Sequence, residues 1–173
     1  MKIDLHSHSF YSDGVLSPSE VVKLASQAGC ELFSLTDHDT TQGSAEAKLE
    51  ADKLNLSLIN GVEISAFWRN MAIHILGLGI DINNDILQTG LEHNQKLRKE
   101  RAEKIALGLW RSGIKDALEK TQSFSKTEML TRTHFAQMLI SEGYCKDMKA
   151  VFRRYLTGKK PGGVGVEWKG FEE

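Results

Sequence analysis

Short apolar segments that alternate with helical ones are the feature of this sequence that most limits what it can fold into. Four segments have the length and residue types of β-strands: residues 2–6, 31–36, 56–65 (interrupted at Asn60-Gly61) and 72–79. Helical segments at residues 17–28 and 43–54 separate the first three strands. Strands that alternate with helices are typical of an α/β fold with a largely parallel sheet.

The first helical segment has a clear beginning and end. Ser17 is suited to the N-cap, Pro18 to the first helical position, and Glu20 completes a capping box with Ser17. Gly29 is a suitable residue to follow the end of the helix, because glycine adopts the left-handed conformation without strain. The sequence therefore predicts a helix that starts after Ser17.

The sequence changes in character after the fourth strand. Three helical segments follow, at residues 84–113, 127–142 and 147–156, and a loop at residues 158–163 separates them from a short final run. We therefore expect a helical insertion at residues 82–157. Residues 1–81 and 158–173 are expected to form the α/β part that this insertion interrupts.

Charge, cysteine content and hydropathy exclude several classes of protein. The formal net charge of −1 gives no overall basic field that would attract a nucleic-acid duplex, although a local basic patch is compatible with it. Cys30 and Cys145 form neither a disulfide framework nor a zinc motif of paired cysteines. No apolar run reaches the roughly 18 residues of a membrane span, and the first residues do not resemble a signal peptide. We expect a cytoplasmic protein that does not associate with membranes.

Two histidines stand at the end of the first strand. His6 and His8 are two residues apart, and side chains at i and i+2 of an extended segment point to the same side. Both imidazoles can therefore bind one divalent ion. A pair of this kind also arises by chance or as a polar strand end, so it indicates a metal only together with other ligands.

Four further residues extend this pair. His38 lies within Asp37-His38-Asp39, where an apolar strand gives way to three titratable side chains, which is costly unless they are solvated or bind a ligand. Glu63 and His74 each lie inside an apolar strand, where a metal ion would be an economical partner and a satisfied core residue is the ordinary alternative. Asp13 precedes a glycine, a pattern that is also common in turns.

The six residues together indicate a metal site at the edge of the sheet where strands end. Imidazole and carboxylate ligands suit Mn²⁺, Zn²⁺ or Fe²⁺ better than Ca²⁺ or Mg²⁺ alone. Clustered metal ions favour hydrolysis of a phosphate ester, because they polarise phosphoryl oxygens and stabilise the leaving oxygen. No P-loop, Rossmann glycine pattern or serine-hydrolase motif competes. The predicted ligands are His6, His8, Asp13, His38, Glu63 and His74.

Several short motifs resemble the opening motifs of the PHP (polymerase and histidinol phosphatase) superfamily. They are Asp4-Leu5-His6-Ser7-His8, Ser12-Asp13-Gly14, Leu35-Thr36-Asp37-His38-Asp39-Thr40, Gly61-Val62-Glu63-Ile64-Ser65 and Ile73-His74-Ile75-Leu76-Gly77. Two further motifs, at residues 131–136 and 151–156, resemble the bacterial subgroup that contains ribonuclease AM and the 3',5'-nucleotide bisphosphate phosphatases. The likeness covers residues 2–160.

The resemblance implies a distorted (β/α)7 barrel with a site for up to three metal ions, usually Mn²⁺, with Zn²⁺, Fe²⁺ or Mg²⁺ as alternatives. It implies that His6, His8 and Glu63 hold one metal, that Glu63 and His74 share a second, and that Asp13 and His38 hold a third. It also implies a metal-dependent phosphoric ester hydrolase that acts on a nucleotide or trims 5' nucleotides from short RNA. Histidinol-phosphate phosphatases and the PHP domains of DNA polymerases are rivals within the superfamily.

Basic residues of the helical part are candidates for substrate binding. By resemblance, Arg132 and His134 lie near the substrate phosphate; a helix-start salt bridge and a surface histidine are the alternative. Arg98 and Arg101 lie three residues apart on one helical face, where they could meet a phosphate as planar donors, but we expect a solvated charged face. Within the metal site, Asp37 or Asp39 is expected to orient His38.

The family pattern continues, with further metal ligands, beyond the motifs found in this sequence. We therefore expect a C-terminally truncated barrel, whether as a fragment or as a natural short form. A barrel that ends early leaves a sheet edge and an apolar face uncovered. We expect such a chain to self-associate or to bind metal weakly, and a catalytically weak or inactive metal-binding domain is the non-enzymatic alternative.

Overall fold

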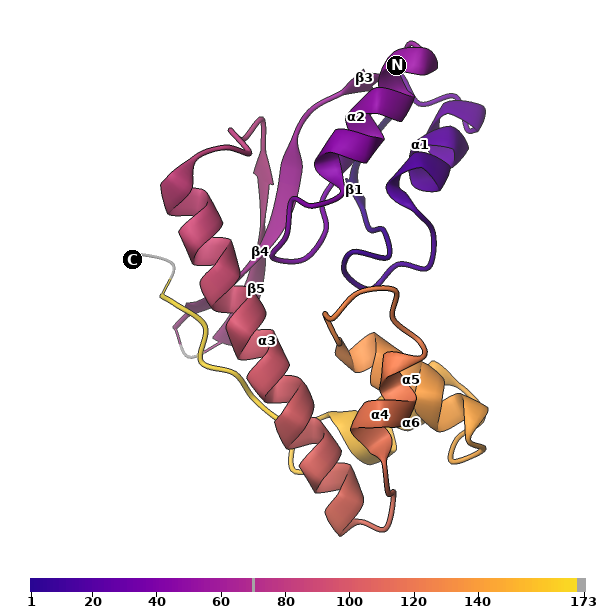
Figure 1. Cartoon of the computed structure of the whole chain (residues 1–173), viewed down its shortest axis with the longest axis vertical. Helices are drawn as coiled ribbons and strands as arrows, with labels where there is room; N and C mark the ends of the chain where they lie inside the picture. Colours follow the sequence, from indigo (N-terminus) through magenta and orange to yellow (C-terminus); the bar gives the residue numbers. More distant parts are fainter. Residues whose placement is uncertain (70, 171–173) are drawn as a thin grey trace. The chain divides into compact units, whose positions relative to one another are not determined.

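The structure, a computed structural model, describes residues 1–69 and 71–170 (Figure 1). It divides into two compact units. The first contains residues 1–95 and the segment that begins at Trp168, and the second contains Lys96–Glu167. The boundaries of the expected helical insertion, at residues 82 and 157, remain a prediction.

A parallel sheet forms the first half of the first unit. Its strands β1 (Ile3–Ser7), β2 (Leu32–Leu35) and β3 (Ser57–Leu58) lie in that order. Helix α1 (Pro18–Gln27) connects β1 to β2, and α2 (Ser44–Lys53) connects β2 to β3. The alternation of strands and helices, and the parallel pairing of these three strands, follow the prediction from the sequence.

The start of α1 has the predicted capping box. The Glu20 N–H donates to Ser17 Oγ over 3.2 Å, and the Ser17 N–H donates to Glu20 Oε2 over 2.7 Å. Pro18 is the first helical residue, and Gly29 beyond the helix has a φ of 79°. Local chemistry alone therefore predicted where this helix starts and ends.

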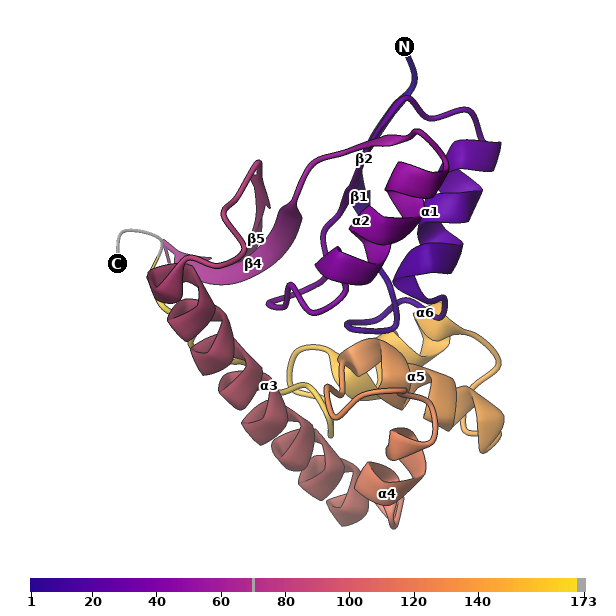
Figure 2. The ribbon, with the colours of Figure 1, turned by 45° about the horizontal axis from the view of Figure 1, so that its top comes forward.

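Helices α1 and α2 lie side by side against one face of the parallel sheet (Figures 1 and 2). Apolar side chains from both helices and from β2 fill the space between them. The buried residues of this core are Val22, Ala25, Phe33, Leu35, Ala47, Ala51 and Leu56. This core anchors β2, and β1 is held through its parallel pairing with β2, which has an irregularity between Asp4 and Ser7.

An antiparallel pair, β4 (Gly61–Trp68) and β5 (Met71–Leu78), follows the parallel sheet in the first unit. The predicted interruption of the strand at residues 56–65 is present, since β3 ends at Leu58 and β4 begins at Gly61. The prediction of one largely parallel sheet was wrong, because β4 pairs with β5 in a separate sheet. Gly61 permits the start of β4 to lie close against β2, since a Cβ there would lie 2.2 Å from Ser34 Oγ.

The loop that follows β2 joins β4 to the parallel sheet. His38 forms an isolated parallel bridge with Glu63. In this bridge the Asp39 N–H donates to Glu63 O over 2.9 Å, and the Glu63 N–H donates to Asp37 O over 3.1 Å. The bridge places a candidate ligand of one segment directly beside a candidate ligand of the other.

The second unit is helical. Helix α3 (Asp85–Arg111) begins in the first unit, and α4 (Ala117–Gln122), α5 (Arg132–Ser141), α6 (Met148–Val151) and the π-helical turn η1 (Phe152–Leu156) follow. The sequence predicted three of these segments but missed α4, and it placed the start of α5 at residue 127, five residues too early. The core consists of Ala102, Ile105, Leu109, Ile114, Ala117, Leu130, Phe135, Ala136, Met138, Leu139, Cys145, Val151 and Leu156.

Within the described residues, no helix has both the length and the apolar composition that a membrane span needs. Both cysteines are free thiols: Cys145 is buried and Cys30 is partly buried. The prediction of no disulfide framework therefore holds for the part of the chain that the structure describes.

Candidate metal centre

The first unit brings all six predicted ligand side chains together. His6 lies on β1, and His8 and Asp13 lie in the loop after it. His38 lies in the loop after β2, while β4 and β5 supply Glu63 and His74. The convergence of separate segments that the sequence suggested is therefore present in the structure.

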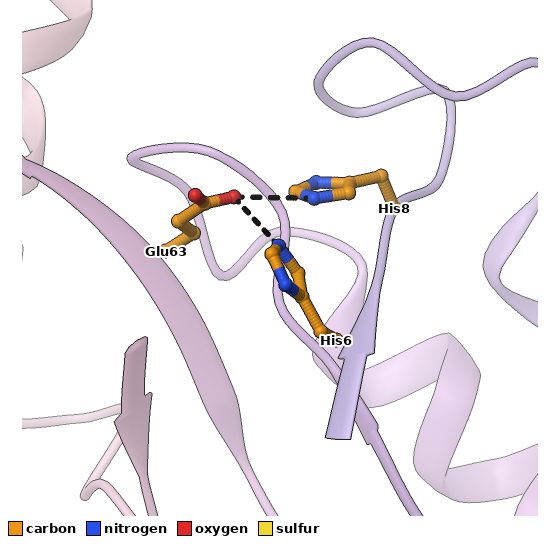
Figure 3. A group of neighbouring side chains, drawn as sticks. All are labelled: His6, His8 and Glu63. Carbon is orange, nitrogen blue, oxygen red and sulfur yellow. Dashed lines mark hydrogen bonds and ion pairs between the residues drawn. The ribbon is translucent and has the colours of Figure 1, made fainter. Parts of the chain in front are cut away.

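Glu63 is the centre of this cluster. Its Oε2 lies 3.1 Å from His6 Nε2 and 3.1 Å from His8 Nε2 (Figure 3). The same oxygen lies 3.2 Å from His38 Nδ1, and Oε1 lies 3.2 Å from His74 Nδ1. The side chain of Glu63 is only 8% exposed, so one nearly buried carboxylate faces four imidazoles.

Asp13 extends the cluster on the other side of His8 and His38. Its Oδ1 lies 3.8 Å from His8 Nδ1 and 4.0 Å from His38 Nε2. The ligand atoms gather in three groups, each within 4.8 Å: His6 with His8 and Glu63, His8 with Asp13 and His38, and His38 with Glu63 and His74. The first group is the one that the resemblance implied. The second adds His8 to the implied pair of Asp13 and His38, and the third adds His38 to the implied pair of Glu63 and His74.

The support of His8 explains which of its nitrogens faces Glu63. Ser12 Oγ donates to Asp37 Oδ1 over 2.7 Å, so its single proton is used there. His8 Nδ1 lies 3.3 Å from the same hydroxyl and must therefore donate to it. In a neutral His8 this leaves an unprotonated Nε2 that points at Glu63, as a metal-ligating histidine requires.

This donor set fits a divalent metal better than it fits a hydrogen-bonded core. In a neutral His8 with its proton on Nδ1, the lone pair on Nε2 faces a carboxylate oxygen at 3.1 Å, which is repulsive unless a cation or a proton lies between them. His38 Nδ1 and His74 Nδ1 also lie 3.2 Å apart beside the same carboxylate. Imidazole and carboxylate donors gathered at this spacing are typical ligands of Mn²⁺, Zn²⁺ or Fe²⁺.

Asp37 has a different partner from the one expected. Its carboxylate accepts from the Ser9 N–H at 2.7 Å, from Ser9 Oγ at 2.6 Å and from Ser12 Oγ, and does not bond His38. Burial raises the pKa of Asp37, while the hydrogen bonds from both serines act in the opposite direction. Asp37 therefore supports the loop that carries His8.

The loop between His8 and Gly14 is tight. The N–H groups of Ser12 and Gly14 both donate to Ser9 O, over 3.1 and 3.0 Å. A Cβ on Gly14 would lie 2.4 Å from His8 O, so only glycine fits this approach. The loop thus places Asp13 close to the histidine with which it shares a ligand group.

The substrate-binding candidates lie in the second unit. His134 is buried, so the alternative of a surface histidine is wrong, and its Nδ1 accepts from the Thr131 N–H over 3.2 Å at the start of α5. Arg132, the first residue of α5, has its guanidinium 5.8 Å from the centre of the Phe152 ring. The structure therefore ties both residues to the first turn of one helix.

The expectation of a solvated face at Arg98 and Arg101 is wrong. Arg98 is buried, and Arg101 is partly buried with its Nε donating to Val164 O over 3.1 Å. Burial, together with the charges of Arg132 and Arg98, lowers the pKa of Arg101 to about 10. Burial and the charge of Arg98 also lower the pKa of Arg132. Three guanidinium groups therefore lie close enough to repel one another.

Residues that support the candidate ligands were missed in the sequence. Ser9 and Ser12 hold Asp37, and Ser65 and Asn94 hold Asp39. Serines in a loop and an asparagine within a long helix are ordinary at those positions, so no signal in a single sequence distinguishes them. Their hydrogen bonds to Asp37 and Asp39 can be recognised only in the folded structure.

Comparison with known proteins identifies the family. The family model for the PHP domain matches residues 4–169. The chain belongs to the PHP domain family. Its relatives include a 3',5'-nucleoside bisphosphate phosphatase of Chromobacterium violaceum, which is 42% identical over 172 residues. They also include the 5'-3' exoribonuclease Rnm of Escherichia coli, 40% identical over 172 residues.

Two solved structures share the fold. A structure described as an amidohydrolase from Chromobacterium violaceum, with bound sulfate and no metal, superposes with a TM-score of 0.95 at 42% identity and covers 99% of this chain. A putative metal-dependent phosphoesterase from Bifidobacterium adolescentis superposes with a TM-score of 0.85 over 98% of the chain, at 23% identity. The second likeness concerns the fold alone.

The relatives are longer than this chain. The match covers 98–99% of this chain but only 60% of the Chromobacterium phosphatase and 59% of the Escherichia exoribonuclease. The structural match likewise covers 61% of the Chromobacterium protein. The chain therefore spans about three fifths of the length of these relatives.

Proposed function

We propose that this chain carries the metal centre of a phosphoesterase that hydrolyses phosphate esters of nucleotides. The substrate would be a 3',5'-nucleoside bisphosphate or the 5' end of a short RNA, the substrates that the names of the two relatives indicate. The observation that carries the proposal is the buried Glu63 carboxylate with four imidazole nitrogens within 3.2 Å. We further propose that the whole protein is a distorted (β/α)7 barrel in the cytoplasm.

The six clustered residues would hold up to three divalent ions, with Mn²⁺ as our proposal for the ion. Such ions polarise phosphoryl oxygens and stabilise the leaving oxygen when a phosphate ester is cleaved. Glu63 can bridge two sites, because its two oxygens face different histidines. Ser12 keeps the proton of His8 on Nδ1 and so leaves Nε2 available as a ligand. The candidate ligands are His6, His8, Asp13, His38, Glu63 and His74.

We propose that Arg132 and His134 bind the phosphate of the substrate, with Arg101 beside Arg132. The neighbouring charges that act on Arg101 are both cationic, so an anionic group would relieve their repulsion. His134 supports the first turn of α5, where Arg132 begins the helix. Guanidinium groups are suited to this task because they present planar pairs of donors to phosphate oxygens.

Replacing Arg132 tests this part of the proposal. We expect Arg132→Gln to raise the KM for a nucleotide substrate by about 10–100-fold, the cost of one lost hydrogen bond to a charged group, with a smaller change in kcat. Arg153→Gln is the matched control, since Arg153 is exposed. Equal KM values for the two variants would argue against a role of Arg132 in substrate binding.

A second candidate function is a metal-binding domain that is catalytically weak or inactive by itself. It is favoured by the extent of the match, since this chain corresponds to only 60% of the phosphatase and 59% of the exoribonuclease. A histidinol-phosphate-type phosphatase is a further alternative. The names of the two relatives favour a nucleotide substrate over histidinol phosphate.

Phosphate release from adenosine 3',5'-bisphosphate in the presence of Mn²⁺ separates these candidates. The comparison is between the unaltered chain and the double variant His8→Ala, Glu63→Ala. We expect release that requires both residues. A folded chain that binds Mn²⁺ but releases no more phosphate than the double variant would leave the metal-binding domain as the function.

We also propose that the isolated chain self-associates through β5. Within the described residues β5 pairs with β4 alone, and Met71, Leu76 and Leu78 on it are exposed. The strand carries no Lys or Pro, the residues that usually protect an edge. We expect sedimentation at micromolar concentration to show dimers or larger species, and Leu76→Lys with Leu78→Lys to shift them to monomer.

The control for this prediction is Leu49→Lys on α2, which alters an exposed leucine away from any strand edge. It should leave the distribution of species unchanged. A monodisperse monomer of the unaltered chain would contradict self-association.

A further inference from the structure

A buried polar cluster lies behind one of the three ligand groups. Asp39 is fully buried, and Ser65 and Asn94 are nearly so. Asp39 Oδ1 accepts from the Ser65 N–H at 2.7 Å and from Asn94 Nδ2 at 2.8 Å, and Oδ2 accepts from Ser65 Oγ at 2.7 Å. One carboxylate thus joins the loop after β2, strand β4 and helix α3.

Helix α3 holds the same loop through its backbone as well. Asn94 Nδ2 also donates to Ser65 O over 2.8 Å, and Gln95 Nε2 donates to Asp39 O over 2.8 Å. Two adjacent side chains of α3 therefore donate hydrogen bonds to the loop after β2 and to strand β4. We call Asp39, Ser65, Asn94 and Gln95 the α3 clamp.

The clamp is adjacent to three candidate ligands that form one group. Asp39 directly follows His38 in the chain. Ser65 is two residues beyond Glu63 on β4, and it lies opposite His74 on β5. His38, Glu63 and His74 are the members of one of the three ligand groups. The clamp therefore fixes the backbone on which each ligand of that group is carried.

The conformation of Asp39 shows that the loop needs such support. Its φ of 51° lies in the left-handed region, which non-glycine residues adopt at a cost. This turn directs the preceding His38 into the cluster while the Asp39 side chain points away, toward Ser65 and Asn94. Strain of this kind persists where the surrounding contacts hold the backbone in place.

We propose that Asp39 is a positioning residue, and that it acts with Ser65 and Asn94 to hold His38, Glu63 and His74 in their metal-binding arrangement. The proposal rests on the metal centre described under the proposed function. It makes α3 part of the support of that centre, although no ligand comes from α3. Loss of the clamp should therefore weaken the group of His38, Glu63 and His74 more than the group of His6, His8 and Glu63, because the two groups share only Glu63.

The test is calorimetric titration of the full chain with Mn²⁺, using Asp39→Asn and Asn94→Ala. Partners that orient metal ligands typically contribute about 10–100-fold to metal affinity, so we expect one class of sites to weaken by that factor. The remaining sites should lose less affinity, because each shares only one ligand with the weakened group. The absorption spectrum of the Co²⁺-substituted protein should change in the same variants, because it reports the geometry of the ligands.

Gln88→Ala is the matched control. Gln88 is also on α3 and donates to Thr41 Oγ1 over 3.0 Å, so it contacts the same loop without touching Asp39. It should leave Mn²⁺ binding and the Co²⁺ spectrum unchanged. Circular dichroism identifies variants that fail to fold. If Asp39→Asn and Asn94→Ala do not fold, the same titration is made with Ser65→Ala, which keeps the hydrogen bond between Asp39 and Asn94.

Two results would overturn the proposal, and they are distinguishable. If the unaltered chain binds Mn²⁺ and the folded clamp variants bind it with the same stoichiometry, affinity and Co²⁺ spectrum, the clamp does not position the ligands. If the unaltered chain binds no Mn²⁺, both the clamp and the proposed function fail together.

Discussion

The variant Glu63→Gln is expected to lose metal binding more completely than any other single change. The carboxylate faces His6, His8, His38 and His74 within 3.2 Å, and an amide of the same shape keeps the packing but removes the charge. We expect Mn²⁺ affinity to fall by more than the ~10–100-fold that loss of a supporting partner costs, and phosphate release to fall with it. Titration calorimetry and a phosphate-release assay measure the two effects.

Glu50→Gln is the control for this prediction. Glu50 is also a nearly buried glutamate of the first unit, but it pairs with Lys23 and Lys53 on the helical side of the sheet. Its loss should leave Mn²⁺ affinity unchanged. The account would be contradicted by a folded Glu63→Gln variant with the metal affinity of the unaltered chain.

The second large effect concerns the stability of the helical unit. Phe135 is fully buried in the core that α3, α4 and α5 share. Phe135→Ala leaves a cavity in that core, and changes of this kind cost about 3–5 kcal/mol of unfolding free energy. Chemical denaturation followed by circular dichroism should show the loss, while metal binding by the first unit persists.

Phe124→Ala is the matched change outside the core, since Phe124 is 37% exposed. Its cost should be much smaller than that of Phe135→Ala. If both variants unfold at the same denaturant concentration as the unaltered chain, Phe135 does not hold a core. If Phe135→Ala abolishes metal binding under conditions where circular dichroism still shows the first unit folded, the two units are not independent.

Local chemistry predicted much of the fold. The capping box of Ser17 and Glu20 and the glycine at position 29 located α1, and apolar runs located β1, β2 and β5. The interruption at Asn60-Gly61 was predicted, but the separate antiparallel sheet was not, because single-sequence patterns do not show which strand pairs with β4. The short helix α4 was missed for a similar reason: six residues give too little periodicity to recognise.

The candidate ligands could be predicted because their chemistry is unusual at strand ends. A histidine or carboxylate in an apolar segment is a modest signal by itself, but six of them that converge on one sheet edge form a strong one. The burial of Arg98 could not be predicted, since a charged residue on a helix ordinarily faces water. The hydrogen-bond partners of Asp37 and Asp39 could not be predicted either, because the sequence does not show which donors come close to a carboxylate in the folded chain.

Anomalous diffraction from a crystal of this chain soaked in Mn²⁺ would locate bound metal ions without an activity assay. We expect anomalous peaks between Glu63 and the imidazoles of His6, His8, His38 and His74, with further density near Asp13. Peaks at that position would place metal ions on the predicted ligands without reference to any substrate. A well-ordered crystal with no peak there, or with metal only at other surface residues, would contradict the account.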